Sequence, residues 1–328
     1  MKRIYSIAML ITLSAWCPFS VYSQTCCTGG APITGGFQIG AEKKGNISFG
    51  AIFDLNRINA LILEGQTLDD DRILRNTNSF IFQGNYGVSD KLTFTMLIPY
   101  VWLNETISGS ISETKSETSG IGDLTLLSQY QVLSKSRSIL TLGLGVKFPT
   151  GGSQLKGQNN FVLPITLQPG SGSFDFILAG QFSTSLFESR QSLSFYNSLT
   201  YRLNTESDKV TFHDTYQFGN ELLVLSGFSD QVLLGSTILE PSLMLRFRHT
   251  GQDTADEHLN PNTGGNWLYL VPGARVKLSS QISSGITADL PIYRNLKGFQ
   301  LTTSYRITFS LFVNLAKKTL SFDIDNSQ

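Results

Sequence analysis

Residues 120–151 decide the fold; they read GIGDLTLLSQYQV, then LSKSRS, then ILTLGLGVKFPTG. In the second arm, apolar residues at even positions alternate with mostly small or polar residues at odd positions, as in Leu142-Gly143-Leu144. A period of two is the period of a β-strand. Because a short polar turn joins two such arms, they are predicted to pair as an antiparallel hairpin. One face of this hairpin is apolar, and its neighbour is either a soluble core or lipid.

The overall composition favours lipid. Charged residues make up 15% of the 328 residues, against about 25% in ordinary soluble domains. Aromatic residues are abundant, with 22 Phe, 11 Tyr and 3 Trp, yet mean hydropathy is only −0.01. No run of 18 apolar residues follows the N-terminus, which excludes helical spans there. In a transmembrane β-barrel only alternate residues touch lipid, and this composition suits that class.

The charge balance excludes two other classes. Lys and Arg together number 25, as do Asp and Glu, so the formal net charge is zero. We therefore expect no nucleic-acid partner and no polybasic anchor for anionic lipid.

Residues 1–23 are predicted to be a secretory signal peptide. Lys2 and Arg3 precede an apolar stretch at 4–13 that is too short to span a membrane, and a small-residue cleavage site ends at Ser23. An uncleaved anchor helix is the alternative. A signal peptide places the mature chain outside the cytoplasm.

Residues 24–45 are interpreted as a periplasmic leader with a vicinal cysteine pair, Cys26 and Cys27. The two thiols are predicted to pair with each other or with another chain. A soft-metal or redox role is the alternative, but a zinc site requires about four ligands. Residues 316–328 are read as a C-terminal tail, and we predict no cofactor.

Twelve segments read as strands and define an outer-membrane β-barrel over residues 46–315. They are residues 46–56, 76–88, 91–104, 121–133, 138–149, 173–186, 191–203, 209–226, 231–249, 266–279, 283–293 and 298–313. Short and longer connections alternate along most of the chain, as is typical of bacterial outer-membrane barrels with periplasmic turns and external loops. This phase places both termini in the periplasm and requires an even strand number. The predicted fold is therefore all-β, an antiparallel up-and-down barrel of about 12 strands.

One predicted strand contains a proline in its interior. Pro241 has strand pattern on both sides, and the apolar series changes phase there. We expect a β-bulge near Glu240 and Pro241, and a short turn at residues 228–230.

Charged residues on the non-apolar face of the strands are the candidate site. A charge on the lipid face is costly, so these side chains are predicted to line the lumen. They are Asp123, Lys147, Asp175, Arg202, Arg246, Arg248, Arg275, Asp289 and Arg306. They could select solutes, as charged pore rings do, or merely form a salt-bridged wall. Six cations against three carboxylates predict a mild preference for anionic or electron-rich solutes.

The histidines support weaker alternatives. His249 and His258 flank an acidic loop that could bind a divalent cation, but their spacing matches no ligand template. His213 could serve as the base of an outer-membrane hydrolase, but no motif selects a serine nucleophile. We therefore predict neither a metal site nor an enzyme.

Three stretches carry a family resemblance: GIGDLTLLSQY at 120–130, GVKFPTG at 145–151, and LPIY at 290–293 followed by GFQL at 298–301. The sequence resembles the outer-membrane proteins of the "meta-pathway of phenol degradation" or transporter family. The resemblance implies a twelve-stranded barrel that passes small hydrophobic or aromatic compounds. Unlike the usual barrel ending, the chain continues past its last strand.

These observations predict a protein of the bacterial outer membrane that passes a small solute passively. Its expected partners are outer-membrane lipid, a small-molecule solute and the barrel-assembly machinery that inserts it; the oligomeric state stays open. A structural or surface-interaction barrel with a plugged lumen is the second reading.

Overall fold

The computed structural model describes residues 24–25, 42–109, 112–157, 160–209, 213–235 and 237–315. The predicted signal peptide at 1–23, Cys26 and Cys27, and the tail at 316–328 lie outside the described residues.

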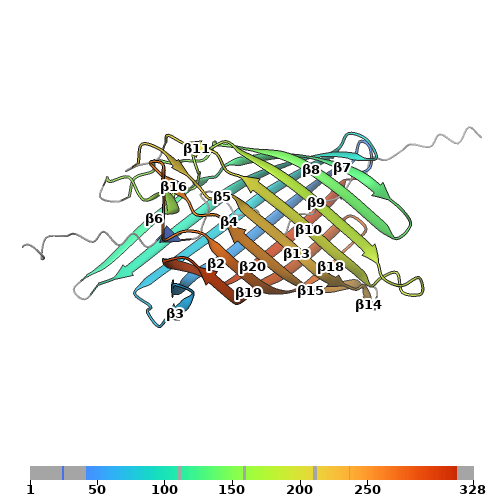
Figure 1. The fold of residues 1–328 in the computed structure, drawn as a ribbon. Coiled ribbons are helices and arrows are strands. Elements are labelled where there is room, and N and C mark those ends of the chain that lie inside the picture. The colour runs from blue at the N-terminus through green and yellow to red at the C-terminus, as the bar shows by residue number, and fades with distance from the viewer. Residues whose placement is uncertain are drawn as a thin grey trace, which may run out of the picture.

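Twelve long antiparallel strands of the described chain form one closed barrel (Figure 1). They are β2 (Ile47–Leu63), β4 (Ile73–Gly87), β5 (Leu92–Ser108), β7 (Leu124–Ser134), β8 (Ser138–Phe148), β9 (Asp175–Ser185), β10 (Ser194–Leu203), β13 (Glu221–Ser229), β15 (Thr237–Thr250), β18 (Gly265–Lys277), β19 (Ile282–Leu296) and β20 (Phe299–Leu315). Pairing of β20 with β2 closes the barrel. Both the predicted class and the predicted strand number are confirmed.

Shorter elements lie at the two ends of the barrel. At the long-loop end lie β3 (Gln66–Leu68), β6 (Glu113–Ile121), η1 (Ile165–Leu167) and a small sheet of β11 (Glu206–Ser207), β12 (Tyr216–Gln217), β16 (Thr254–Ala255) and β17 (His258–Leu259). At the short-turn end, β14 (Val232–Leu234) pairs with β15. The two-residue strand β1 (Gln24–Thr25) pairs in parallel with the start of β20, at the long-loop end. In such barrels the long loops face outside and the short turns face the periplasm.

In the part of the chain that the structure describes, no helix has both the length and the apolar character needed to cross a membrane.

The hairpin of β7 and β8 has the two faces that its alternation predicts. Leu142 and Leu144 are 50% and 66% exposed, whereas Thr141 and Lys147 are buried inside the barrel. An exposed band of apolar and aromatic side chains continues around the other strands. Because a lipid-facing wall needs such a band, the apolar face of the hairpin is the lipid face.

Three local predictions are wrong. The eighth strand begins at Glu221 rather than at residue 209, because residues 213–220 belong to the outer loops and their small sheet. The turn that follows lies at Gly235, not at 228–230, since β13 and β14 keep one register with β15.

The third error is the bulge expected at Glu240 and Pro241. The β15–β18 register runs through both residues without a shift, and the β13–β15 and β14–β15 pairings on either side of them keep one register. Pro241 still accepts a hydrogen bond from the Asp230 backbone N–H at 3.1 Å. Its ring removes only one donor from the ladder, and the sheet tolerates that loss without an extra residue.

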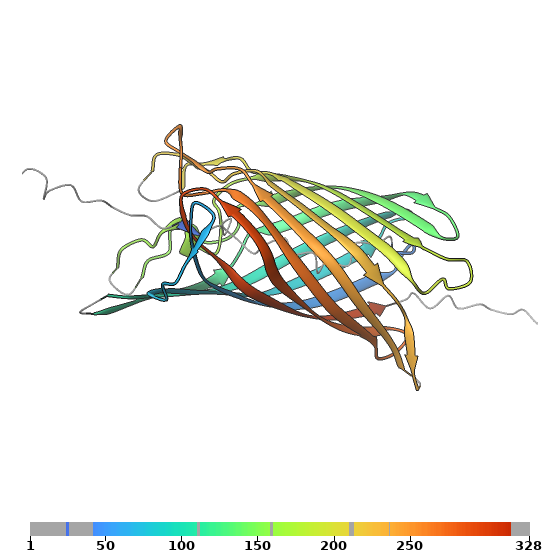
Figure 2. The same ribbon diagram turned by 60° about the horizontal axis from the view of Figure 1, so that its bottom comes forward.

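Register shifts occur elsewhere, and those between β18 and β19 and between β2 and β20 lie on the two sides of an interrupted seam. The β19–β20 ladder ends at the pair Asp289 and Arg306, although both strands continue toward the long-loop end. Pro291, which has no backbone N–H, follows two residues later. Above this point the side chain of Arg294 bridges the strands by donating from Nη2 to the Thr303 carbonyl at 2.7 Å. Both strands run along the near wall in Figure 2.

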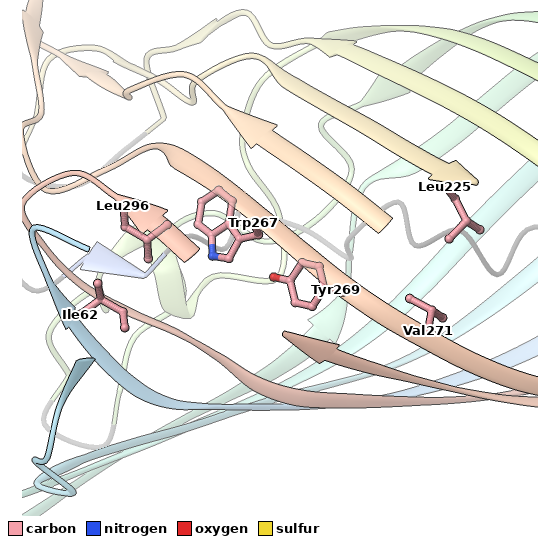
Figure 3. Packing of buried hydrophobic residues seen from close by; sticks show 6 residues of the cluster. All are labelled: Ile62, Leu225, Trp267, Tyr269, Val271 and Leu296. Atoms are coloured by element: carbon pink, nitrogen blue, oxygen red, sulfur yellow. The ribbon is translucent and has the colours of Figure 1, made fainter. Parts of the chain in front are cut away.

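Apolar side chains fill part of the interior beside this seam. Trp267 and Leu296 are almost fully buried and form one cluster with side chains of β2, β13 and β18 (Figure 3). Trp267 also donates from its indole nitrogen to Thr302 Oγ1 at 2.9 Å, which connects β18 to β20 across β19. Leu301, on the apolar series by sequence, is buried against Ile58 and Leu61 rather than exposed to lipid.

Candidate functional site

The nine charged residues selected from the sequence all lie inside the barrel wall. Six are buried, and Arg248, Arg275 and Arg306 are half-buried. The structure brings them together in separate ionic groups, with carboxylates that sequence reasoning did not select.

The first group centres on Lys147. Its Nζ lies 2.9 Å from Asp123 Oδ2 and 2.6 Å from Asp175 Oδ2, across three neighbouring strand ends. Ser171, from the loop between β8 and β9, donates its backbone N–H and its hydroxyl to Asp123 Oδ2 at 2.9 and 2.7 Å. Ser173 donates to Asp175 Oδ1 at 2.9 Å. The buried cation therefore neutralises two carboxylates and fixes the end of that loop.

The second group centres on Glu221, which sequence reasoning missed. Arg202 Nη2 lies 2.6 Å from one carboxylate oxygen, and Arg248 Nε lies 2.5 Å from the other. The Arg248 guanidinium also lies 4.9 Å from the centroid of the Trp267 ring, a cation–π geometry. Two arginines thus share one carboxylate.

The third group runs from β2 to β15. Arg306 Nε lies 3.5 Å from Asp54 Oδ1, and its Nη1 lies 3.9 Å from Asp289 Oδ2. Arg246 pairs with Asp289 across the intervening strand β18. Asp54 accepts a further hydrogen bond from Thr308 Oγ1 at 2.9 Å.

A fourth pair completes the charged band, which consists of these four ionic groups. Arg75 donates from Nε to Glu105 Oε2 at 2.8 Å, and both side chains are buried. Among the described residues, these four groups contain six cations and six carboxylates. The excess of cations expected from the sequence is therefore wrong, because Asp54, Glu105 and Glu221 were not counted.

Strand parity was the signal that could have found the missing residues. Asp54 alternates with the exposed Phe53 of β2, and Glu221 starts the alternation of β13. Glu221 lies within the segment 209–226, which was predicted to be one strand. The sequence therefore did not indicate that Glu221 begins a strand after a loop.

The loop between β8 and β9 packs against the wall and against a second loop at the long-loop end of the barrel. Leu167 of η1 is 1% exposed and packs against Val101 and Leu103 of β5. Ile165 packs against Tyr216 and Phe218 from the loop between β10 and β13. Apolar contacts between two loops and the wall therefore hold this turn in place.

Gln168 secures the same loop by hydrogen bonds. Its amide nitrogen donates to the carbonyls of Leu155 and Leu163 at 3.0 and 2.9 Å, and its amide oxygen accepts from the Leu155 N–H at 2.9 Å. The segment is thus folded on itself, as well as on the barrel.

Two aspartates join the outer loops. Asp253 accepts from the Tyr216 hydroxyl at 2.5 Å and from the Gly219 N–H at 2.8 Å. Burial raises the pKa of Asp253 above 3.8, despite these hydrogen bonds. Burial, together with the charge of Asp253, raises the pKa of Tyr216 well above 10.0.

Asp256 is the second aspartate that joins the outer loops. It accepts from the Asp214 and Thr215 N–H groups, and His213 Nδ1 lies 2.9 Å from its Oδ2. The hydrogen bond with His213 holds the pKa of Asp256 below 3.8.

The other histidines lie apart from this contact. His249 Nδ1 lies 2.8 Å from Asn266 Oδ1, and His258 is exposed in β17. Among residues with described positions, no three His, Cys, Asp or Glu side chains are grouped as metal ligands would be.

Below the charged band, the short-turn half of the barrel contains a cavity of about 390 Å³. Its lining is mainly polar, with serines and threonines from six strands, together with Arg246, Arg275 and Glu240. Tyr196, Leu225, Met244 and Val271 form an apolar side. Of the nine charged residues selected from the sequence, Arg275 lines this cavity without belonging to the charged band.

The comparisons with known proteins agree with this architecture. Residues 69–290 match the family described as "Putative MetA-pathway of phenol degradation". No curated protein matches. Among solved structures, the COG4313 outer membrane channel from Pseudomonas putida F1 has a TM-score of 0.64 at 14% identity, over 84% of this chain and 97% of that one.

A second solved structure, the transport unit of the autotransporter AIDA-I from Escherichia coli, has a TM-score of 0.47 at 11% identity, over 86% of this chain and 93% of that one. At such identities, the similarity to the Pseudomonas putida channel concerns the fold alone. The family match covers more than half of the chain, and the closed barrel carries a continuous apolar outer face. The chain is therefore an outer-membrane β-barrel that belongs to the phenol-degradation MetA-pathway family.

Proposed function

We propose that this barrel is a passive channel for small solutes in the bacterial outer membrane. The observation that carries the proposal is the polar cavity of about 390 Å³ below the charged band. A barrel with a purely structural role gains stability by filling such space, because empty volume forfeits packing contacts. Its proposed partners are membrane lipid on the outer face and a small solute inside; insertion by the barrel-assembly machinery stays a prediction.

The route that we propose is gated at the outer mouth. A solute moving from the outside meets the turn at Ile165–Leu167 first and the charged band second. Leu167 must leave its place between Val101 and Leu103 before the mouth widens. The expected behaviour is low open probability with brief openings.

The test is electrical recording of the folded protein in planar bilayers, with Leu167→Asp as the informative variant. A buried aspartate without a partner destabilises the docked loop, so we expect the open probability to rise several-fold. Leu259→Asp is the control, because Leu259 is 65% exposed in the outer loops. Absence of current and of solute uptake for the wild type and for Leu167→Asp would contradict the channel function.

A plugged barrel that presents its outer loops to a partner is the second candidate. The buried contacts of η1 and the Asp253 and Asp256 hydrogen bonds favour it, since they hold the loops as one layer. The same recordings separate the candidates, because a permanent plug predicts no current from either protein.

A further inference from the structure

The cavity in the short-turn half contains a cation that is bound less tightly than the others. The side chain of Arg275 is 43% exposed, and its Nη1 lies 3.9 Å from Glu240 Oε1. By contrast, Lys147, Arg202 and every other cation of the charged band are at most 15% exposed. Each of those has a carboxylate oxygen within 3.5 Å. The side chain of Arg275 is thus more exposed than that of any cation in the charged band.

The sheet leaves room beside this side chain. In the registers, Arg275 lies opposite Glu240 on β15 and opposite Gly285 on β19. Because Gly285 has no side chain, nothing from that position covers the guanidinium. Gly273, two residues before Arg275, also lies on the cavity side, and a Cβ there would come within 2.8 Å of Ser242 Oγ. Neither glycine places a side chain beside Arg275.

The remaining lining offers two further contacts for a bound molecule. Gln181 borders the cavity, and its side-chain NH2 group can donate a hydrogen bond to a solute. Tyr196 and Met244 border the cavity and pack on the apolar interior cluster, so they offer an apolar surface to the solute body. A cation on one side and an apolar surface on the other suit a molecule with one charged end.

We propose that this cavity is a binding site for small organic carboxylates, with Arg275 holding the carboxylate group. A guanidinium presents paired N–H donors that match the two oxygens of a carboxylate. Glu240 competes with the solute for Arg275, which keeps binding weak and reversible, as conduction requires. A volume of about 390 Å³ falls in the range of pockets for small ligands. The inference rests on the proposed channel function and adds its solute class.

The experiment measures block of the KCl current by hexanoate, with hexanamide as the uncharged analogue of similar size. For the wild type we expect hexanoate, and not hexanamide, to reduce the current at millimolar concentrations. Arg275→Gln is expected to weaken the block at least ten-fold, and Arg275→Lys to restore part of it. Glu240→Gln is expected to strengthen the block several-fold, because it removes the competing carboxylate.

Arg137→Gln is the matched control. Arg137 is 42% exposed, has Glu188 at 3.2 Å, and lies in a turn at the same end of the barrel, outside the cavity lining. Hexanoate should block the current of Arg137→Gln as strongly as that of the wild type. Equal block by hexanamide, an unchanged block in Arg275→Gln, or a weaker block in Glu240→Gln would overturn the proposal.

Failure of the channel function is distinguishable from failure of this site. If the folded protein passes no KCl current, the channel function is rejected. Calorimetric titration of the detergent-solubilised barrel with hexanoate still tests the site. Binding that is lost in Arg275→Gln supports the site, and no difference from the wild type overturns it.

Discussion

Single residues decide how charge is accommodated inside this barrel. Lys147 and Glu221 are each nearly fully buried, and each contacts two groups of opposite charge. Burying an ion without partners costs several kcal/mol, so each depends on its neighbours. Strand parity places Lys147 inside, but it cannot indicate that Ser171 comes from a loop 24 residues later to complete the group.

Lys147→Met tests this dependence. The variant leaves Asp123 and Asp175 buried and facing each other without a cation, and removing one partner of a buried pair costs about 3–5 kcal/mol. We expect a lower urea midpoint for unfolding from lipid vesicles. Lys135→Met, in an exposed turn, should stay within about 0.5 kcal/mol of the wild type. Equal midpoints for the two variants would show that the buried group adds nothing to stability.

At the scale of elements, the β7–β8 hairpin shows how alternation is converted into two environments. Leu126, Leu142 and Leu144 face lipid, whereas Gln129, Thr141 and Lys147 face the interior. Leu127 is an exception, since it is buried against Ile177 and Ala179. The pattern survives an irregularity near Leu133, where the β7–β8 register shifts and Val132 becomes the extra residue.

Leu142→Lys should harm insertion, since a Lys on the lipid face costs about 2–4 kcal/mol near the bilayer midplane. Leu142 is 50% exposed on that face. Gln131→Lys, at a half-buried position on the opposite face of the neighbouring strand, is the control. Heat-modifiable gel mobility reports the folded fraction. Equal folding of both variants would mean that Leu142 does not contact lipid.

The interrupted seam between β19 and β20 leads to a prediction about hydrogen exchange along β20. Backbone N–H groups of residues 302–305 that point toward β19 lack the ladder that residues 306–313 make. Their hydrogen exchange should be at least ten-fold faster, and Arg294→Ala should increase it further by removing the bond to Thr303. Those N–H groups within residues 302–305 that point toward β2 instead provide the internal reference. Uniform protection along β20 would contradict the interruption.

For the whole molecule, the balance of charge matters more than any one residue. Six cations face six carboxylates in the described band, and Arg275 faces Glu240 below it. We therefore expect weak selectivity between K⁺ and Cl⁻, with a reversal potential near zero in a ten-fold KCl gradient. Glu221→Gln should shift it toward anion preference, because Arg202 and Arg248 lose their shared carboxylate. Clear anion selectivity of the wild type would restore the expectation drawn from the sequence.

The sequence by itself determined the class, the strand number and the two faces of the wall. These follow from period-two alternation and from the spacing of turns, which are local properties of the chain. The expectation that Lys147 and the other selected charges point inward rests on the same local alternation. The bulge expected at Pro241 is absent, because one missing donor is a local cost that the neighbouring strands absorbed.

Only the tertiary structure decided which charges pair and where the loop between β8 and β9 docks. Arg246 and Asp289 meet across β18, and Leu167 reaches Val101 from a distant loop. Such contacts depend on barrel closure and register, which bring together residues far apart in sequence. Alternation states which face a side chain occupies, but not its height along the barrel axis or its partner. The neutral charged band and the cavity beside Arg275 are therefore properties of the closed barrel.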